Sequence, residues 1–94
     1  MKATLLARSK EVRDDGSIVE VVVWSLLEAL APSRHLFKYR LFFGQPGEDR
    51  VRYDNERGKG DHRHINGREL PYVFESLDKL LDDFDQDVKN WSPS

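Results

Sequence analysis

The chain contains no cysteine in its 94 residues. A disulfide framework, a cysteine-ligated zinc site and a thiolate nucleophile are therefore excluded. Long apolar runs are missing as well. The N-terminus lacks the apolar core of a signal peptide, and no run approaches the roughly 20 apolar residues that span a bilayer. These absences predict a cytoplasmic protein that meets no membrane.

A second domain has no room in a chain of this length, because one hydrophobic core normally serves up to roughly 250 residues. Residues 1–94 are therefore expected to form a single domain. A domain this small buries only roughly 60–65% of the surface that its unfolded chain exposes, so its stability is small. A tightly bound partner would add to that stability.

Charge is distributed unevenly, although the formal net charge is only −2. Residues 50–68 hold six cations and three acids, together with His62 and His64. Residues 75–90 hold six acids and two cations. A basic segment separated from an acidic one points to a polyanionic partner.

Apolar patterns predict strands over about residues 2–54. The β-branched run 17–24 is apolar at nearly every position, which is typical of a central strand. Asp15-Gly16 precedes it and predicts a hairpin with a first strand over about Lys2 to Arg13. Ser25 to Ala31 is expected to be a connection with at most one helical turn.

A second hairpin is predicted around the turn-forming segment 44–48, because residues 36–43 before it and 50–54 after it alternate in polarity. The aromatic and aliphatic side chains of both strands are expected to face the core together. Four cations then share the opposite face, and Arg40 with Arg52 is one candidate for a directly opposed pair. These cations are Lys38, Arg40, Arg50 and Arg52.

Apolar residues spaced by three and four predict an amphipathic helix over about 76–91, with Ser76 as its N-cap. The residues of this stripe are Leu77, Leu80, Leu81, Phe84, Val88 and Trp91. The segment 53–68 is expected to be a loop. The predicted fold is therefore α+β, an antiparallel sheet of about four to five strands built from two hairpins, with the C-terminal helix packed on it.

Two histidines give the loop its candidate chemistry. His62 and His64 point the same way if the segment is extended, and Arg63 points the opposite way. One imidazole can remove the proton of a ribose 2′-hydroxyl while the other protonates the leaving 5′ oxygen. A cation would stabilise the transferring phosphate. The residues proposed for catalysis are His62, His64, Asp54 as an orienting carboxylate, and Arg57, Lys59 or Arg63 as the cation.

A competing interpretation is a metal site, in which His62 and His64 act with Asp54 or Asp61. Histidines two apart occur in zinc and manganese sites, but the sequence spacing does not specify further ligands. Both histidines could also be exposed loop residues without chemistry. Asp54 and Asn55 likewise have a structural interpretation, because such residues often bond nearby backbone amides where a strand ends.

A longer pattern adds to these local observations. The segment Arg52 to His64, followed by Pro71-Tyr72-Val73-Phe74 and the acidic helix, resembles the TumE family of toxins from bacterial type II toxin–antitoxin systems. The resemblance extends over nearly the whole chain, including the Asp15-Gly16 hairpin and Lys38-Tyr39-Arg40. The positions that match the family's central motif are Tyr53, Asp54, Asn55, Gly58, Gly60, His62 and His64.

The resemblance implies a small cytoplasmic toxin that arrests growth and is held inactive by a cognate helix-turn-helix antitoxin. Ribonuclease action is the usual expectation for such toxins, so our leading hypothesis is a metal-independent endoribonuclease without a cofactor. The partners expected are RNA, the antitoxin and, as an alternative, a second copy of the chain. The residues expected to contact RNA are Lys38, Arg40, Arg50, Arg52, Tyr53, Asn55, Gly58, Gly60 and Arg63.

Three further hypotheses stay open. A non-catalytic module could sequester RNA or a protein through the basic hairpin face and the 53–64 motif. An enzyme of this size could also modify nucleotides or proteins. If His62 and His64 bind a metal ion, the protein could instead be a metal-dependent hydrolase.

Overall fold

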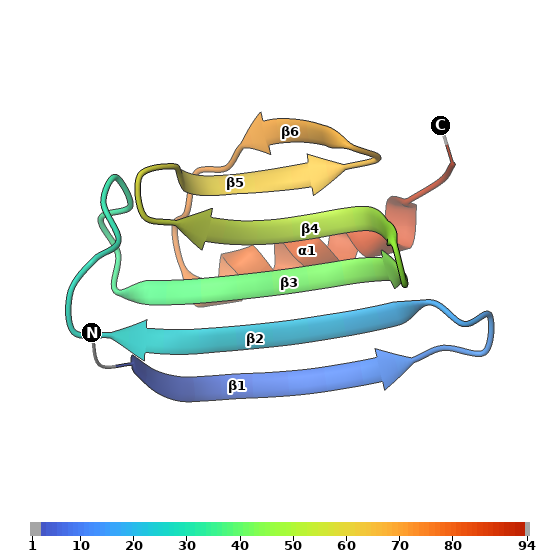
Figure 1. Ribbon diagram of the computed structural model, residues 1–94, viewed down its shortest axis with the longest axis horizontal. Helices are drawn as coiled ribbons and strands as arrows, with labels where there is room; N and C mark the ends of the chain where they lie inside the picture. The colour runs from blue at the N-terminus through green and yellow to red at the C-terminus, as the bar shows by residue number, and fades with distance from the viewer. Residues whose placement is uncertain (1–2, 94) are drawn as a thin grey trace.

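The computed structural model describes residues 3–93, which form one six-stranded antiparallel sheet and one helix (Figure 1). The strands lie in the sheet in the order of the chain, β1-β2-β3-β4-β5-β6. Their bounds are β1 Ala3–Val12, β2 Ile18–Leu26, β3 Phe37–Gln45, β4 Glu48–Glu56, β5 Gly60–Ile65 and β6 Arg68–Pro71, followed by α1 Leu77–Asn90. The predicted α+β class is confirmed.

The strand count is six, so the expected four to five strands were too few. The difference lies in the segment 53–68, which is largely sheet: β4 continues to Glu56, and β5 and β6 follow. Sequence patterns miss β5 because most of its side chains are polar. Its backbone is nevertheless paired on both sides, since Arg63 lies opposite Tyr53 of β4 and Leu70 of β6. Hydrogen bonding to two neighbours outweighs the low strand propensity.

Both predicted hairpins are present. Val12 and Ile18 are the last paired residues of the first hairpin, and Ser17 donates from its backbone N–H and its hydroxyl to Asp15 Oδ1, at 2.8 and 2.6 Å. Lys2, the expected start of the first strand, lies outside the described residues. Past Leu26 the chain runs to β3 without a helical turn in residues 27–36. All ten residues of β1 are exposed, because only β2 lies beside it.

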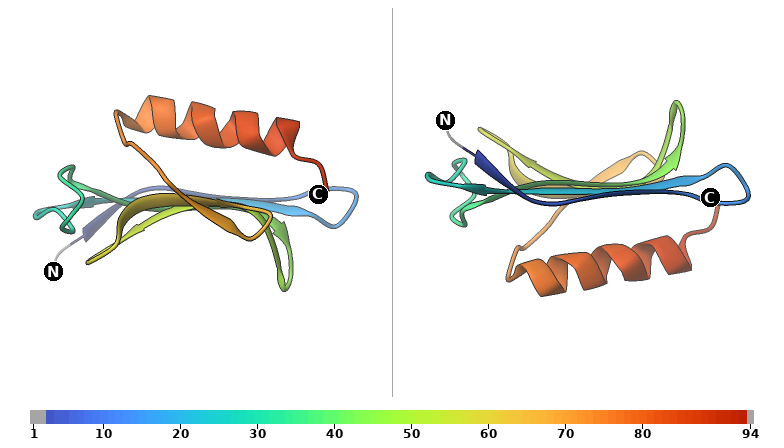
Figure 2. Two further views of the ribbon diagram at one scale, coloured as in Figure 1. Left: turned by 90° about the horizontal axis from the view of Figure 1, so that it is seen from above. Right: turned by 90° about the horizontal axis from the view of Figure 1, so that it is seen from below.

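The helix covers one face of the sheet and leaves the other uncovered (Figure 2). Ser76 caps it as predicted, because its side chain accepts a hydrogen bond from the N–H of Lys79 at 3.1 Å. The predicted stripe packs on the sheet except Leu81, which is 38% exposed. The buried core residues are Val23, Tyr39, Leu41, Phe43, Val51, Tyr53, Leu80, Phe84 and Val88. Among residues 3–93, no helix is long and apolar enough to cross a membrane.

The face without the helix, called here the open face, carries Lys38, Arg40 and Arg52 as expected from parity. Arg40 and Arg52 are not opposed: Arg40 lies opposite Asp54, and Arg52 lies opposite Phe42. An opposite-charge pair across β3 and β4 thus replaces the like-charge pair that the sequence suggested. Such cross-strand pairs of opposite charge are stabilising.

Arg50 does not share the open face, so that part of the expectation was wrong. The register between β3 and β4 shifts next to Phe43, and the shift leaves Arg50 as an extra residue in β4. Its guanidinium carbon lies 4.4 Å from the centre of the Trp91 ring and 5.5 Å from that of Phe43. Arg50 therefore packs on the helix side of the sheet.

Two adjacent leucines of α1 provide a test of this packing. Leu80 is fully buried and Leu81 is 38% exposed. We expect Leu80→Ala to lower the free energy of unfolding by about 2–5 kcal/mol, because it leaves a cavity in the core. Leu81→Ala should cost less than about 1 kcal/mol. Urea unfolding followed by circular dichroism measures both, and equal losses would contradict the packing.

Candidate active site

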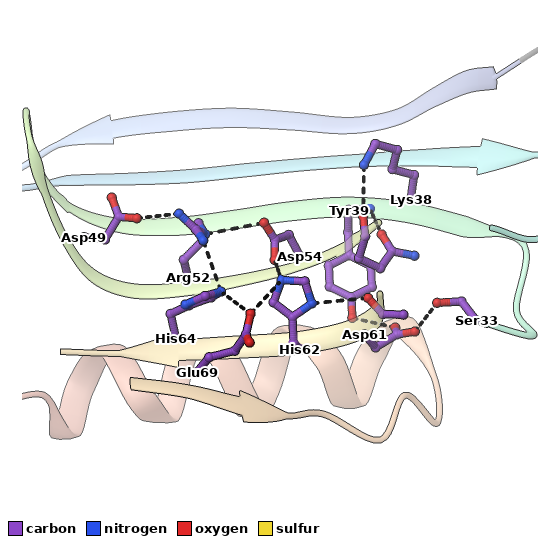
Figure 3. A network of polar contacts seen from close by, with 12 residues as sticks. Ser33, Lys38, Tyr39, Asp49, Arg52, Asp54, Asp61, His62, His64 and Glu69 are labelled. Carbon is purple, nitrogen blue, oxygen red and sulfur yellow. Dashed lines mark hydrogen bonds and ion pairs between the residues drawn. The ribbon is translucent and has the colours of Figure 1, made fainter. Parts of the chain in front are cut away.

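Asp54, His62 and His64 lie together on the open face (Figure 3). Antiparallel pairing of β4 with β5 sets Asp54 opposite His62 and Arg52 opposite His64. Because alternate residues of a strand share a face, the two imidazoles lie side by side, with ring centres 5.1 Å apart. A nitrogen of each ring and an oxygen of the carboxylate all lie within 4.8 Å of one another.

His62 is held at both nitrogens. Its Nε2 lies 2.7 Å from Asp54 Oδ1, and its Nδ1 lies 3.3 Å from the carbonyl oxygen of Gly60. The His62 residue is only 6% exposed and Asp54 9%. Asp54 therefore contacts His62 in the way an orienting carboxylate would, and the ring has little freedom to turn.

His64 faces a guanidinium. Its Nε2 lies 3.1 Å from Arg52 Nη2 and 3.5 Å from Glu69 Oε1. Burial is the main cause that lowers the pKa of His64 below 6.5, and the nearby charges of Arg52 and His62 lower it further. At neutral pH the ring is therefore neutral. Since Arg52 can only donate, the Nε2 lone pair of His64 is its acceptor.

Gly60 supports His62 from the backbone. Its φ of +78° favours glycine, and a Cβ at this position would lie 3.0 Å from Pro32 Cγ. The carbonyl that faces His62 belongs to this residue. The close packing of Gly60 against Pro32 therefore fixes the start of β5 and, through it, the imidazole. This gives Gly60, one of the two glycines of the motif, a structural reason.

A pocket of about 320 Å³ opens beside His62. Its lining residues are Lys59, Asp61, His62, Glu69, Leu70 and Pro71. Lys59 is thus the one proposed cation of the β4–β5 turn that lines this pocket. Arg57, in the same turn, is exposed and does not line it.

A family model described as Toxin TumE matches residues 2–92. The chain belongs to the TumE toxin family. The resemblance inferred from the motif is thereby confirmed, and membership implies an antitoxin as partner. No curated protein and no solved structure gives a significant match.

Two residues of the TumE motif lie in the interior of the sheet. Tyr53 is fully buried, and its hydroxyl bonds the Asp87 carboxylate of α1. Asn55 is also fully buried, and its side chain continues the ladder with β3: Oδ1 accepts from the N–H of Tyr39 at 3.0 Å, and Nδ2 donates to Phe37 O at 2.8 Å. Neither side chain reaches a surface where RNA could contact it, so their place in the motif has a structural cause.

In this TumE-family protein, Arg63 lies on the helix side of the sheet, whereas the two histidines lie on the open face. Its Nη1 lies 3.2 Å from Asp87 Oδ2 and 3.2 Å from the hydroxyl of Tyr53. The predicted opposite direction of Arg63 is confirmed, and the structure does not bring its guanidinium together with the two imidazoles. Arg52, expected only to contact RNA, is the cation beside the histidines.

Asp61, the other carboxylate considered for a metal site, also faces the helix side. It accepts hydrogen bonds from the hydroxyls of Ser33 and Tyr39, the latter at 2.6 Å, and lies 2.7 Å from His35 Nε2. No local sequence pattern predicts this cluster, because Ser33 and His35 lie 28 and 26 residues from Asp61. Parity along β5 was the available signal that Asp61 is separated from His62 and His64.

The lowered pKa of His64 leads to a test by NMR titration. Arg52→Gln should raise the pKa of His64, because a positive charge 3.1 Å from Nε2 is removed, while burial keeps it below 6.5. Arg8→Gln, on the exposed strand β1, is the control and should leave it unchanged. A His64 pKa that does not respond to Arg52→Gln would contradict the contact.

The same pKa shift predicts a pH dependence of stability. The pKa of His64 is lower in the folded chain than the ordinary 6.5, so the unfolded chain binds the proton more readily. The free energy of unfolding should therefore fall as the pH drops below about 6.5. Replacing His64 by Gln should weaken that dependence.

Proposed function

We propose that this TumE-family toxin cleaves RNA by proton transfer between two histidines, without a metal ion. The observation that carries the proposal is the pair of adjacent imidazoles of His62 and His64. One ring lies beside a carboxylate, and the other lies beside a guanidinium. Asp54 accompanies His62 at 2.7 Å, and Arg52 accompanies His64 at 3.1 Å. Two rings with different neighbours are suited to different protonation states, as general acid and general base require.

His64 is assigned the role of base, because its lowered pKa leaves it neutral near pH 7. When Arg52 turns from His64 Nε2 to the phosphate, Nε2 accepts the proton of the ribose 2′-hydroxyl, and the 2′ oxygen attacks phosphorus. The bond from phosphorus to the 5′ oxygen breaks, and His62 gives a proton to that oxygen. The products are a 2′,3′-cyclic phosphate and a 5′-hydroxyl. Asp54 can form an ion pair with His62 when the imidazole is protonated.

Arg52 is the cation assigned to the phosphate. Its guanidinium lies next to His64 and forms ion pairs with Asp49 at 2.5 Å and Asp54 at 3.4 Å. Arg40, further along the open face, lies 3.7 Å from Glu20. These cations are largely neutralised by acids, so an RNA phosphate has to displace a carboxylate partner. The open face therefore supports local phosphate contacts around the histidines more than broad electrostatic attraction.

Membership of a toxin family supports the biological role. We infer that the cleavage arrests growth and that a cognate antitoxin with a helix-turn-helix DNA-binding domain holds the toxin inactive. Binding of such a partner over the histidine pair would block the approach of RNA. A single domain of this size also gains stability from a bound partner.

Cleavage of total RNA in the presence of EDTA tests the chemistry. His64→Ala should reduce the rate by about 10²–10⁴, because a general base is lost. The control is His35→Gln, which changes a histidine on the other face and should retain activity once circular dichroism shows that it is folded. Cleavage by the wild type that disappears with EDTA would contradict the metal-free mechanism.

Growth arrest distinguishes this proposal from a non-catalytic RNA-binding module. A toxin with both His62→Ala and His64→Ala should no longer arrest growth. Arrest that survives both replacements but disappears when Arg40 and Arg52 are replaced together would favour sequestration of RNA.

A further inference from the structure

We propose that Asp54, His62 and His64 also form a binding site for a divalent transition-metal ion such as Zn²⁺, and that this ion inhibits the toxin. The inference rests on the proposed function, because the ion binds the ring nitrogens on which the acid holds its proton and the base accepts one. The site lies on the open face between β4 and β5, beside the pocket next to His62.

The spacing of the donor atoms suits such an ion. Zinc bonds of about 2.0–2.1 Å place neighbouring ligand atoms of a tetrahedron about 3.3 Å apart. Here His62 Nε2 and Asp54 Oδ1 are 2.7 Å apart, and the donor atoms of all three residues lie within 4.8 Å. These values bracket the required distance, so small rotations of the side chains bring the three atoms onto one ion.

The hydrogen bonding of Asp54 is a second, independent observation. Its Oδ1 is buried and has no well-aligned hydrogen-bond donor, although His62 Nε2 is only 2.7 Å away. The carbonyl oxygen of Gly60 can only accept, so Nδ1 of His62 can hold one ring proton, and Nε2 beside the carboxylate is left for a second proton or a metal ion. In the proposed reaction a proton lies between Nε2 and the carboxylate, and a metal ion competes for the same place.

The backbone contact of His62 is also what a metal ligand requires. Histidines that bind metals usually donate their other ring nitrogen to a carbonyl or carboxylate, which fixes the ring and its tautomer. Gly60 provides that acceptor. Because Gly60 is itself fixed against Pro32, the ligand is positioned before an ion arrives.

Glu69 is the candidate fourth ligand. Its Oε1 lies 3.5 Å from His64 Nε2 and 3.9 Å from His62 Nε2, and its side chain is 56% exposed and free to turn. The donor set would be two imidazoles and two carboxylates. Imidazole favours Zn²⁺, Ni²⁺ or Cu²⁺, whereas Mg²⁺ and Ca²⁺ prefer oxygen ligands.

Arg52 competes with the ion for His64, so the inference predicts opposite effects for the loss of Arg52 and the loss of a ligand. Its Nη2 donates to His64 Nε2, the lone pair that the ion would use. The guanidinium is already paired with Asp49 at 2.5 Å and can stay with it when it leaves His64. Removing Arg52 should therefore strengthen metal binding, whereas removing a ligand should weaken it.

Titration of the EDTA-treated, desalted toxin with Co²⁺ tests the site without RNA, through the visible absorption of the bound ion. We expect saturation at one ion per chain and displacement of Co²⁺ by Zn²⁺. Asp54→Asn and His64→Ala should each weaken binding by at least about tenfold. Arg52→Met should tighten it, and His35→Gln should not change it. Circular dichroism of each variant establishes that it is folded.

Absence of saturable Co²⁺ and Zn²⁺ binding would overturn the site, as would binding that Asp54→Asn and His64→Ala leave intact. Weaker binding in Arg52→Met would overturn the proposed arrangement.

RNA cleavage is then measured with Zn²⁺ and with EDTA. Inhibition by Zn²⁺ that EDTA reverses supports the proposal that the ion inhibits the toxin, and unaffected cleavage refutes it. If cleavage instead requires the ion, the site stands and the metal-free mechanism fails. If no RNA is cleaved, the Co²⁺ titration still decides whether the ion binds.

Discussion

The register between β4 and β5 is the constraint on which the candidate site depends. Successive side chains of a strand point to opposite faces, so a slip by one residue would exchange the two sides of β5. His62 and His64 would then lie under the helix, and Arg63 would lie on the open face. Contacts on the helix side hold the observed register: Tyr53 lies opposite Arg63, and both reach Asp87 of α1. A partly buried polar contact on one face thus determines which groups meet on the other.

The two faces of the sheet have different tasks. On the helix side, buried aromatic rings and hydrogen-bonded tyrosines supply stability, and burial raises the pKa of Tyr39 and Tyr53 far above the ordinary range. On the open face, charged groups stand in a partly exposed network in which most cations have an acid beside them. A motif read along the chain combines both tasks, which is why Tyr53 and Asn55 accompany the histidines in it without joining them in space.

Much of the fold could be predicted because it rests on periodic apolar residues. The alternation in 36–43, the spacing of Leu80, Phe84 and Val88, and Ser76 as the cap are local features, and each has its expected place. The two last strands could not be recognised, since β5 is defined by its neighbours and not by its own side chains. The approach of His62 to His64 followed from parity. The contact of Arg52 with His64 and the place of Arg50 on the helix side did not, because the first depends on strand pairing and the second on a shift of register next to Phe43 that no local pattern encodes.

The six-stranded sheet has two edge strands, β1 and β6, and each is protected from further pairing in a different way. At one edge β6 is only four residues long and closes with Pro71, which has no N–H to offer. At the other, β1 is ten residues long and exposed throughout, with Leu5 and Leu6 each 50% accessible. Unpaired strands of this kind recruit further strands and begin aggregation. Arg8 and Lys10 place two positive charges along that edge, and charged side chains on an edge strand disfavour pairing with a further strand.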